Sequence, residues 1–121
     1  MLTPHIVVVD DDDAIRELVV AVVQETIPSA EVSAHTSAIY ALQESITGTI
    51  DLLITNCHMP DMDGPTLIRT LREEKNKVRI IMVSGSDEAR ELAEEVGVDA
   101  FVPKYALREA LMEAIRSLVA A

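Results

Sequence analysis

Two groups of polar side chains in this sequence have the types and spacing that phosphoryl and cation chemistry requires. Four consecutive aspartates at positions 10–13 directly follow an apolar run. One aspartate is enough to cap a helix, and adjacent carboxylates repel one another, so Asp10 and Asp11 favour a hard cation such as Mg²⁺. Ser84 and Lys104 follow two later apolar runs. A hydroxyl and an ammonium group that face two carboxylates could hold a phosphoryl group and its metal ion.

Each of these residues also has an ordinary structural explanation. An aspartate at a helix N-terminus accepts hydrogen bonds from free N–H groups and complements the helix dipole. Ser84 could begin a helix, and Lys104 could be a solvated loop charge. The single Cys57 is best explained as a small buried hydrophobic residue. The three histidines lack the spacing of zinc ligands with one another or with Cys57, so a zinc site is disfavoured.

Five apolar runs alternate with five amphipathic patterns, and this order predicts the elements that position the polar side chains. Three of the runs are continuously apolar, as buried parallel strands are, and the segments between runs have the 3.6-residue spacing of helices. Alternating strand and helix units predict a doubly wound α/β fold, a five-stranded parallel sheet with helices on both faces. The predicted strands are residues 6–9, 31–34, 52–55, 80–83 and 100–102, and the predicted helices are residues 13–26, 37–46, 65–74, 87–96 and 107–120.

The residues at the predicted element ends support this interpretation and place the polar side chains together. Pro65 suits the first turn of its helix, Ser86 suits an N-cap, and Gly97 suits a left-handed helix end. In an open parallel sheet, ligands bind outside the carboxyl ends of the strands. We therefore expect the residues that follow the strands, including Asp10, Asn56, Ser84 and Lys104, to line one cup.

The composition fits one domain over residues 1–121. Hydrophobic residues make up 49% of the chain, which is enough for a core of its own. The 21 acidic and 10 basic side chains give a net charge of −11, which argues against direct contact with nucleic acid or with an anionic membrane, since both attract clustered lysine and arginine. The sequence shows no membrane-spanning run, no internal disulfide and no signal-peptide pattern, so a cytoplasmic protein is expected.

Taken together, the motifs resemble a known family. Over essentially its full length, the chain resembles the receiver domain of bacterial two-component response regulators, whose fold is flavodoxin-like and CheY-like. The most specific stretch is MPDMDG at positions 59–64, after an apolar strand, and VDD at 9–11, MVSG at 82–85 and VPK at 102–104 accompany it. In that family, an aspartate at the end of the third strand accepts a phosphoryl group from a histidine kinase, and an acidic pair holds Mg²⁺. By motif, the resemblance assigns the metal shell to Asp10, Asp11, position 56 and the backbone carbonyl of His58, the switch to Ser84 and Phe101, and the phosphate contact to Lys104.

The acceptor position of the family falls on Asn56, and this departure changes the expected chemistry. A primary amide is neutral and a poor nucleophile, so an acyl phosphate is not expected to form at Asn56. Mg²⁺ should bind weakly or not at all, because one of three carboxylates is missing. Without a phosphoryl group, Ser84 and Phe101 lack a ligand that distinguishes two conformations, so the resting arrangement is expected.

The resemblance therefore implies a phosphorelay signalling module and not an enzyme. One interpretation is a naturally degenerate receiver that acts by protein–protein interaction, and the other is an engineered Asp-to-Asn form of a phospho-accepting receiver. The natural form is favoured because Thr55 and Tyr105 also depart from the usual pattern. Many family members have a cis proline where this chain has Tyr105, and a trans Lys104–Tyr105 peptide is expected here.

Protein partners, either a histidine kinase or an output domain or protein, are implied by the resemblance. In the family, the partner face is the fourth helix, the fifth strand and the fifth helix. The fourth predicted helix, residues 87–96, is strongly acidic, which favours a basic surface on the partner. Its charged residues are Asp87, Glu88, Glu91, Glu94 and Glu95 against Arg90 alone.

An enzyme alternative is a phosphatase similar to the haloacid dehalogenases. Its strand-end Asp-x-Asp motif would make Asp10 the nucleophile and Asp12 the general acid/base. That chemistry needs a further acidic pair downstream of Lys104. Only Glu109 and Glu113 remain there, both on the terminal predicted helix, so this alternative is disfavoured.

Overall fold

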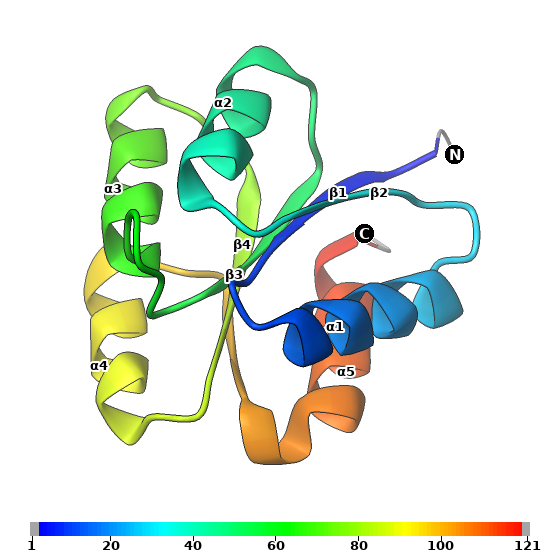
Figure 1. Cartoon of the computed structure of the whole chain (residues 1–121). Coiled ribbons are helices and arrows are strands. Elements are labelled where there is room, and N and C mark those ends of the chain that lie inside the picture. The colour runs from blue at the N-terminus through cyan, green and yellow to red at the C-terminus, as the bar shows by residue number, and fades with distance from the viewer. Residues whose placement is uncertain (1–2, 120–121) are drawn as a thin grey trace.

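Five short parallel strands form the centre of the structure, and a helix connects each strand to the next one along the chain (Figure 1). The computed structural model describes residues 3–119. Within this range the strands pair side by side in the order β2-β1-β3-β4-β5, all in parallel. This confirms the predicted fold class. The strands are β1 (His5–Val9), β2 (Glu31–His35), β3 (Leu52–Asn56), β4 (Arg79–Ser84) and β5 (Ala100–Pro103).

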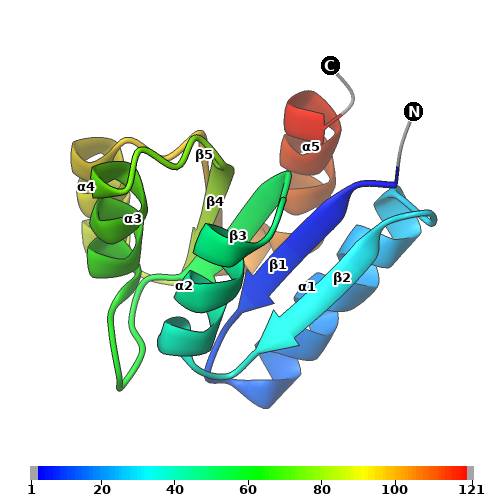
Figure 2. The same cartoon turned by 90° about the horizontal axis from the view of Figure 1, so that it is seen from above.

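The helices cover both faces of the sheet, as Figure 2 shows from above. The first and last helices pack on one face, and the other three pack on the opposite face. The predicted helix ends lie within one residue of the observed ones, except that residue 120, the predicted end of the last helix, lies outside the described residues. The helices are α1 (Asp13–Thr26), α2 (Ala38–Thr47), α3 (Gly64–Glu73), α4 (Asp87–Val96) and α5 (Leu107–Val119), with a 3₁₀ turn η1 (Lys104–Ala106) before α5.

Alternating side chains of the central strands build two aliphatic core layers. Ile6 and Val8 of β1 face the α1 and α5 side, where they join Leu111 and other buried residues. Val7 and Val9 face the other side, toward α2, α3 and α4. Because successive strand residues point to opposite faces, a continuously apolar strand is what a sheet covered on both faces requires. The rigid double core fixes the ends of the strands, where the polar residues begin.

The helix ends follow the predicted capping chemistry in part. Asp12 is the N-cap of α1, and its side chain accepts a hydrogen bond from the Ile15 N–H. Gly97 ends α4 in the left-handed conformation, with φ of 76°. Ser86 stands at the N-cap position of α4, but its side chain forms no capping hydrogen bond. Helix α3 begins at Gly64, one residue earlier than predicted, because Asp63 caps it.

A polar cluster, formed by His5, Ser33, His35 and Glu44, ties α2 to strands β1 and β2. His35 Nε2 lies 2.6 Å from one carboxylate oxygen of Glu44, and His5 Nε2 lies 2.9 Å from the other. The Ser33 hydroxyl also donates to Glu44 at 2.8 Å. Although burial acts to raise it, hydrogen bonds from His35 and Ser33 hold the pKa of Glu44 below its usual range.

The sequence gives no indication of this cluster, because its histidines are 30 positions apart and meet only through strand pairing. Within residues 3–119, no helix combines the length and apolar character needed to cross a bilayer.

Candidate functional site

The polar residues predicted to share one cup lie at the same edge of the sheet. Asp10 directly follows β1, Asn56 ends β3 and Ser84 ends β4. Asn56 pairs in register with Val83, the neighbour of Ser84. Ser84 in turn lies opposite Pro103, which precedes Lys104. The chain leaves β1 for β2 on one side and returns to β3 on the other, so this edge is the topological switch point where ligands bind in such folds.

Asn56 is the centre of the site, and its side-chain amide is fully engaged. The side chain is 7% exposed. Its Nδ2 donates to the backbone carbonyl of His58 at 2.8 Å and lies 3.4 Å from Oδ1 of Asp10 and also of Asp11. Its Oδ1 accepts a hydrogen bond from the Cys57 N–H at 2.8 Å.

Neighbouring groups fix the orientation of this amide. The His58 carbonyl and the two carboxylates can only accept from a donor, whereas the Cys57 N–H can only donate. A flipped amide would place Oδ1 against three acceptors and Nδ2 against a donor. The observed orientation is therefore the one that satisfies every partner of Asn56.

The four consecutive aspartates have different surroundings. Asp10 is 2% exposed, and its Oδ1 accepts from the Asp12 N–H at 2.9 Å. Burial raises the pKa of Asp10, although the Asp12 N–H and the charge of Lys104 act to lower it. Asp11 is exposed, and Asp12 caps α1. The Asp12 carboxylate, which the phosphatase alternative would use as its general acid/base, accepts the capping hydrogen bond from the Ile15 N–H.

The oxygen ligands that the resemblance implies for Mg²⁺ surround Asn56, but Asn56 itself does not fit among them. Asp10, Asp11 and the His58 carbonyl offer hard oxygen atoms. Asn56 turns its nitrogen toward these atoms and its oxygen away. Among residues 3–119, no group of three or more His, Cys, Asp or Glu side chains is placed to hold a metal ion.

The two residues predicted to act as a switch have partners outside the Asn56 network. Ser84 is buried, and its hydroxyl accepts a hydrogen bond from the Ser86 N–H at 3.3 Å. Phe101 packs partly buried against the core. The guanidinium carbon of Arg90, on α4, lies 4.6 Å from the centre of the Phe101 ring, a cation–π contact that the sequence analysis did not predict.

The two aspartates of the MPDMDG stretch, predicted only as parts of a motif, form hydrogen bonds that hold this loop. Asp61 accepts from the Ser37 hydroxyl at 2.6 Å and from the first N–H groups of α2. The hydrogen bond from Ser37 is the main cause that lowers the pKa of Asp61 to about 2. Asp63 caps α3 through the Thr66 N–H at 2.8 Å. An aspartate just before Gly-Pro at a helix start was the signal that could have revealed the second cap.

Gly64 closes this loop against the end of β3. Its N–H donates to the Cys57 carbonyl at 2.7 Å. A Cβ at position 64 would lie 2.4 Å from the backbone oxygen of Asn56, so only glycine permits this approach. The loop that carries His58 is therefore fixed at both ends, next to Asn56. The Lys104–Tyr105 peptide is trans, as expected, like every peptide bond in residues 3–119.

Comparison with known proteins identifies the family to which this chain is similar. The family model described as "Response regulator receiver domain" matches residues 6–116. The sensor kinase CckA of Brucella abortus is 32% identical over 102 residues, which cover 82% of this chain and 11% of that protein. The chain spans only 11% to 36% of the length of this and two further curated relatives.

Solved structures share the whole architecture. The response regulator TrrA of Thermotoga maritima, in complex with Mg²⁺ and BeF, is 27% identical with a TM-score of 0.86, and the match covers 97% of this chain and all of that one. The chemotaxis response regulator CheY4 of Vibrio cholerae is 21% identical with a TM-score of 0.84, over 98% of this chain and all of that one. The second likeness concerns the fold alone.

Proposed function

Because the chain belongs to the response regulator receiver domain family, we propose that it is a receiver of two-component signal transduction that transmits signals without accepting a phosphoryl group. Receiver domains are signalling modules that interact with histidine kinases and output domains. The observation that carries the proposal is Asn56, at the end of β3, where the family has its acceptor aspartate. The proposal covers this domain, since longer relatives contain other parts.

The chemistry of the amide supports this proposal. In a phospho-accepting receiver, a carboxylate oxygen attacks phosphorus and the leaving group departs with the electron pair. The Asn56 side chain is neutral, and its single oxygen already accepts the Cys57 N–H. A neutral amide oxygen is a weak nucleophile. Phosphoryl transfer to this side chain is therefore not expected.

The absence of a phosphoryl group also affects the switch residues, Ser84 and Phe101. A two-state equilibrium shifts only if a ligand binds the two states with different affinity. Without a phosphoryl group, Ser84 keeps its hydrogen bond from the Ser86 N–H, and Phe101 keeps its contact with Arg90. We infer a receiver of constant conformation, whose signal depends on whether a partner is bound.

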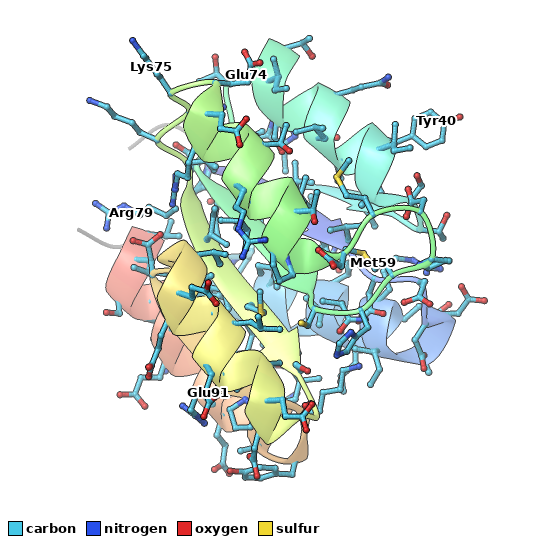
Figure 3. All side chains as sticks on the ribbon, turned by 90° about the vertical axis from the view of Figure 1, so that its left-hand side faces the viewer. Tyr40, Met59, Glu74, Lys75, Arg79 and Glu91 are labelled. Atoms are coloured by element: carbon cyan, nitrogen blue, oxygen red, sulfur yellow. The ribbon has the colours of Figure 1, made fainter. Side chains whose placement is uncertain are left out.

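The partner face that we propose is α4, β5 and α5. Figure 3 shows Glu91 pointing outward from α4. The exposed acidic residues of α4 outnumber its one basic residue, which would attract a basic surface on the partner. The acidic side chains are Asp87, Glu88, Glu91, Glu94 and Glu95.

The decisive experiment is incubation with acetyl phosphate and Mg²⁺ followed by intact-mass measurement. The wild-type chain is expected to keep its mass, whereas Asn56→Asp is expected to gain one phosphoryl group as acetate is released. Asn76→Asp is the matched control, because it makes the same substitution at the other asparagine of the chain. A phosphoryl adduct on the wild-type chain that disappears in Asn56→Ala would refute the proposal. The same results are expected whether Asn56 is natural or engineered.

A further inference from the structure

We propose that the side-chain amide of Asn56 takes the place of a divalent cation in this site, so that the pocket is assembled without metal. The inference rests on the proposed function and specifies how the same site is held together. It departs from the magnesium binding that family membership implies. The hydrogen-bond geometry around Asn56 carries it.

Three oxygen atoms from two loops converge on one nitrogen. Nδ2 of Asn56 donates to the His58 carbonyl at 2.8 Å, and Oδ1 of Asp10 and of Asp11 each lie 3.4 Å from it. Asp10 and Asp11 follow β1, whereas His58 follows β3. The amide thus connects the β1–α1 loop with the β3–α3 loop. A cation bound by the same oxygens would make the same connection.

The amide also supplies part of the positive charge that a cation would bring. Its two N–H hydrogens carry partial positive charge and face two carboxylates and a carbonyl dipole. The oxygen atoms of Asp10, Asp11 and the His58 carbonyl would otherwise repel one another. Here they all accept from the same amide group. Asn56 is 7% and Asp10 2% exposed, so water screens the contact between these two residues only weakly.

Entry of a divalent cation would require this arrangement to break. An amide nitrogen that carries hydrogens has no free lone pair for a hard cation, which prefers oxygen ligands. Rotating the amide to present Oδ1 would remove the hydrogen bond from the Cys57 N–H at 2.8 Å and the one to the His58 carbonyl. A buried donor left without a partner is costly, so rotation opposes cation binding.

Asn56→Asp should make the site depend on a bound cation. The variant replaces two donor hydrogens by an oxygen and places a third carboxylate beside Asp10 and Asp11. Those groups repel one another until a cation neutralises them. A single substitution is therefore expected to convert a pocket closed by its own amide into one that needs metal.

Thermal unfolding with and without millimolar MgCl₂, at matched ionic strength, tests the inference. The wild-type chain is expected to keep its melting temperature. Asn56→Asp should melt below the wild type without Mg²⁺ and gain about 2 °C or more when Mg²⁺ is added, through ligand binding to the folded state. Asn76→Asp adds the same charge far from the site, where Asn76 bonds to the Ser45 carbonyl, and should not respond to Mg²⁺.

A second measurement does not depend on stability. Mn²⁺ prefers the same oxygen ligands and broadens the NMR signals of nearby nuclei. Substoichiometric Mn²⁺ should selectively broaden the backbone signals of residues 10, 11 and 56–58 in Asn56→Asp. The wild-type spectrum should lack this selective broadening.

Two outcomes would overturn the inference. One is an Mg²⁺-dependent rise in the wild-type melting temperature that equals that of Asn56→Asp, and the other is equal Mn²⁺ broadening in both chains. A wild-type chain that binds metal yet keeps its mass with acetyl phosphate would refute this inference and leave the proposed function in place. A wild-type chain that becomes phosphorylated would refute the proposed function, whatever the metal measurements give.

Discussion

The carboxylate of Asp61 acts outside its own loop. It stands between β3 and α3, yet it accepts hydrogen bonds from Ser37 and from the backbone N–H groups of Ala38 and Ile39 at the start of α2. A carboxylate at a helix N-terminus also interacts favourably with the helix dipole. One side chain therefore positions the loop that carries His58 and caps a neighbouring helix at the same time.

Asp61→Asn is expected to lower stability near neutral pH, because the amide is a weaker acceptor with no charge for the dipole. The pKa of Asp61 in the folded chain, about 2, lies below its ordinary value of 3.8. Its stabilising effect is thus present above the ordinary value and is lost as the pH falls through about 2. Thermal unfolding should give a higher melting temperature for the wild type than for Asp61→Asn near neutral pH. The difference should become progressively smaller in acid.

The exposed residue Glu88 provides the control for this experiment. Glu88→Gln removes one carboxylate from another helix start and should show a smaller pH-dependent difference. An Asp61→Asn difference that stays constant down to about pH 2 would contradict the assignment of this cap.

At the residue scale, the sequence predicted which side chains gather at the site but not how they are oriented. Asp10, Ser84 and Lys104 were predictable, because residues that follow parallel strands share one edge of the sheet. The orientation of the Asn56 amide depends on where the Cys57 N–H and the His58 carbonyl point. Those directions follow from the loop conformation, which local sequence patterns do not encode.

At the scale of elements, helix α2 is held to the sheet by a carboxylate in addition to its apolar side. Glu44 reaches His35 and Ser33 on β2 and His5 on β1. Strand β2 is one of the two edge strands of the sheet, and none of its residues is fully buried. The cluster of His5, Ser33, His35 and Glu44 therefore reinforces the part of the fold with the least apolar burial.

Glu44→Gln is expected to reduce the free energy of unfolding by about 1 kcal/mol near neutral pH, since it removes the charge from partly exposed hydrogen bonds. The pKa of Glu44 is lowered in the folded chain, so its contribution is present above the ordinary value of 4.5. The contribution is lost as the pH falls through the lowered folded value. Urea unfolding at several pH values measures the difference.

Hydrogen exchange localises the effect of Glu44→Gln. Amide protons of α2 should exchange faster in the variant, whereas those of α5 should not change. Glu113→Gln, an exposed position on α5, is the control. Uniform acceleration across all helices would show that Glu44 supports the whole fold and not α2 in particular.

Hydrophobic periodicity predicted all five strands and all five α-helices, because strand and helix spacing are local properties. Contacts between elements could not be predicted from the sequence in the same way. The sequence did not predict the η1 turn at Lys104–Ala106, the joint use of Glu44 by two histidines, or the stacking of Arg90 on Phe101. Each of these depends on strand order and packing, which are settled only when the chain is folded.

At the scale of the whole molecule, half of the ten basic residues lie between positions 69 and 79, in α3, the turn after it and the first residue of β4. Figure 3 shows Lys75 and Arg79 at one side of the molecule, apart from Met59 in the β3–α3 loop. Arg72 bonds to the Asn76 and Val78 carbonyls and so supports the turn after α3. Residues 69–79 carry a net charge of +3, so the rest of the chain carries −14. A basic partner would therefore be attracted to the acidic part of the surface, which includes α4.

The double variant Glu91→Lys with Glu95→Lys should weaken binding of a lysine-rich peptide used as a probe of this face. Its matched control, Glu17→Lys with Glu31→Lys, changes the net charge equally, from −11 to −7, at exposed positions away from α4. NMR titration at low salt should map the peptide to α4 in the wild type, and only the first variant should lose this contact. Equal weakening in both variants would mean that net charge alone governs binding.

The burial of Cys57 gives the protein an internal reporter. It is the only cysteine in the chain, it is 1% exposed, and it lies between Asn56 and His58. Burial also raises the pKa of its thiol, so the reactive thiolate is scarce in the closed structure. Cys57 belongs to the core layer under α2, α3 and α4, so a thiol reagent can reach its sulfur only when this part of the structure opens. The rate of labelling therefore measures how often the core layer next to Asn56 opens, without a cysteine having to be introduced.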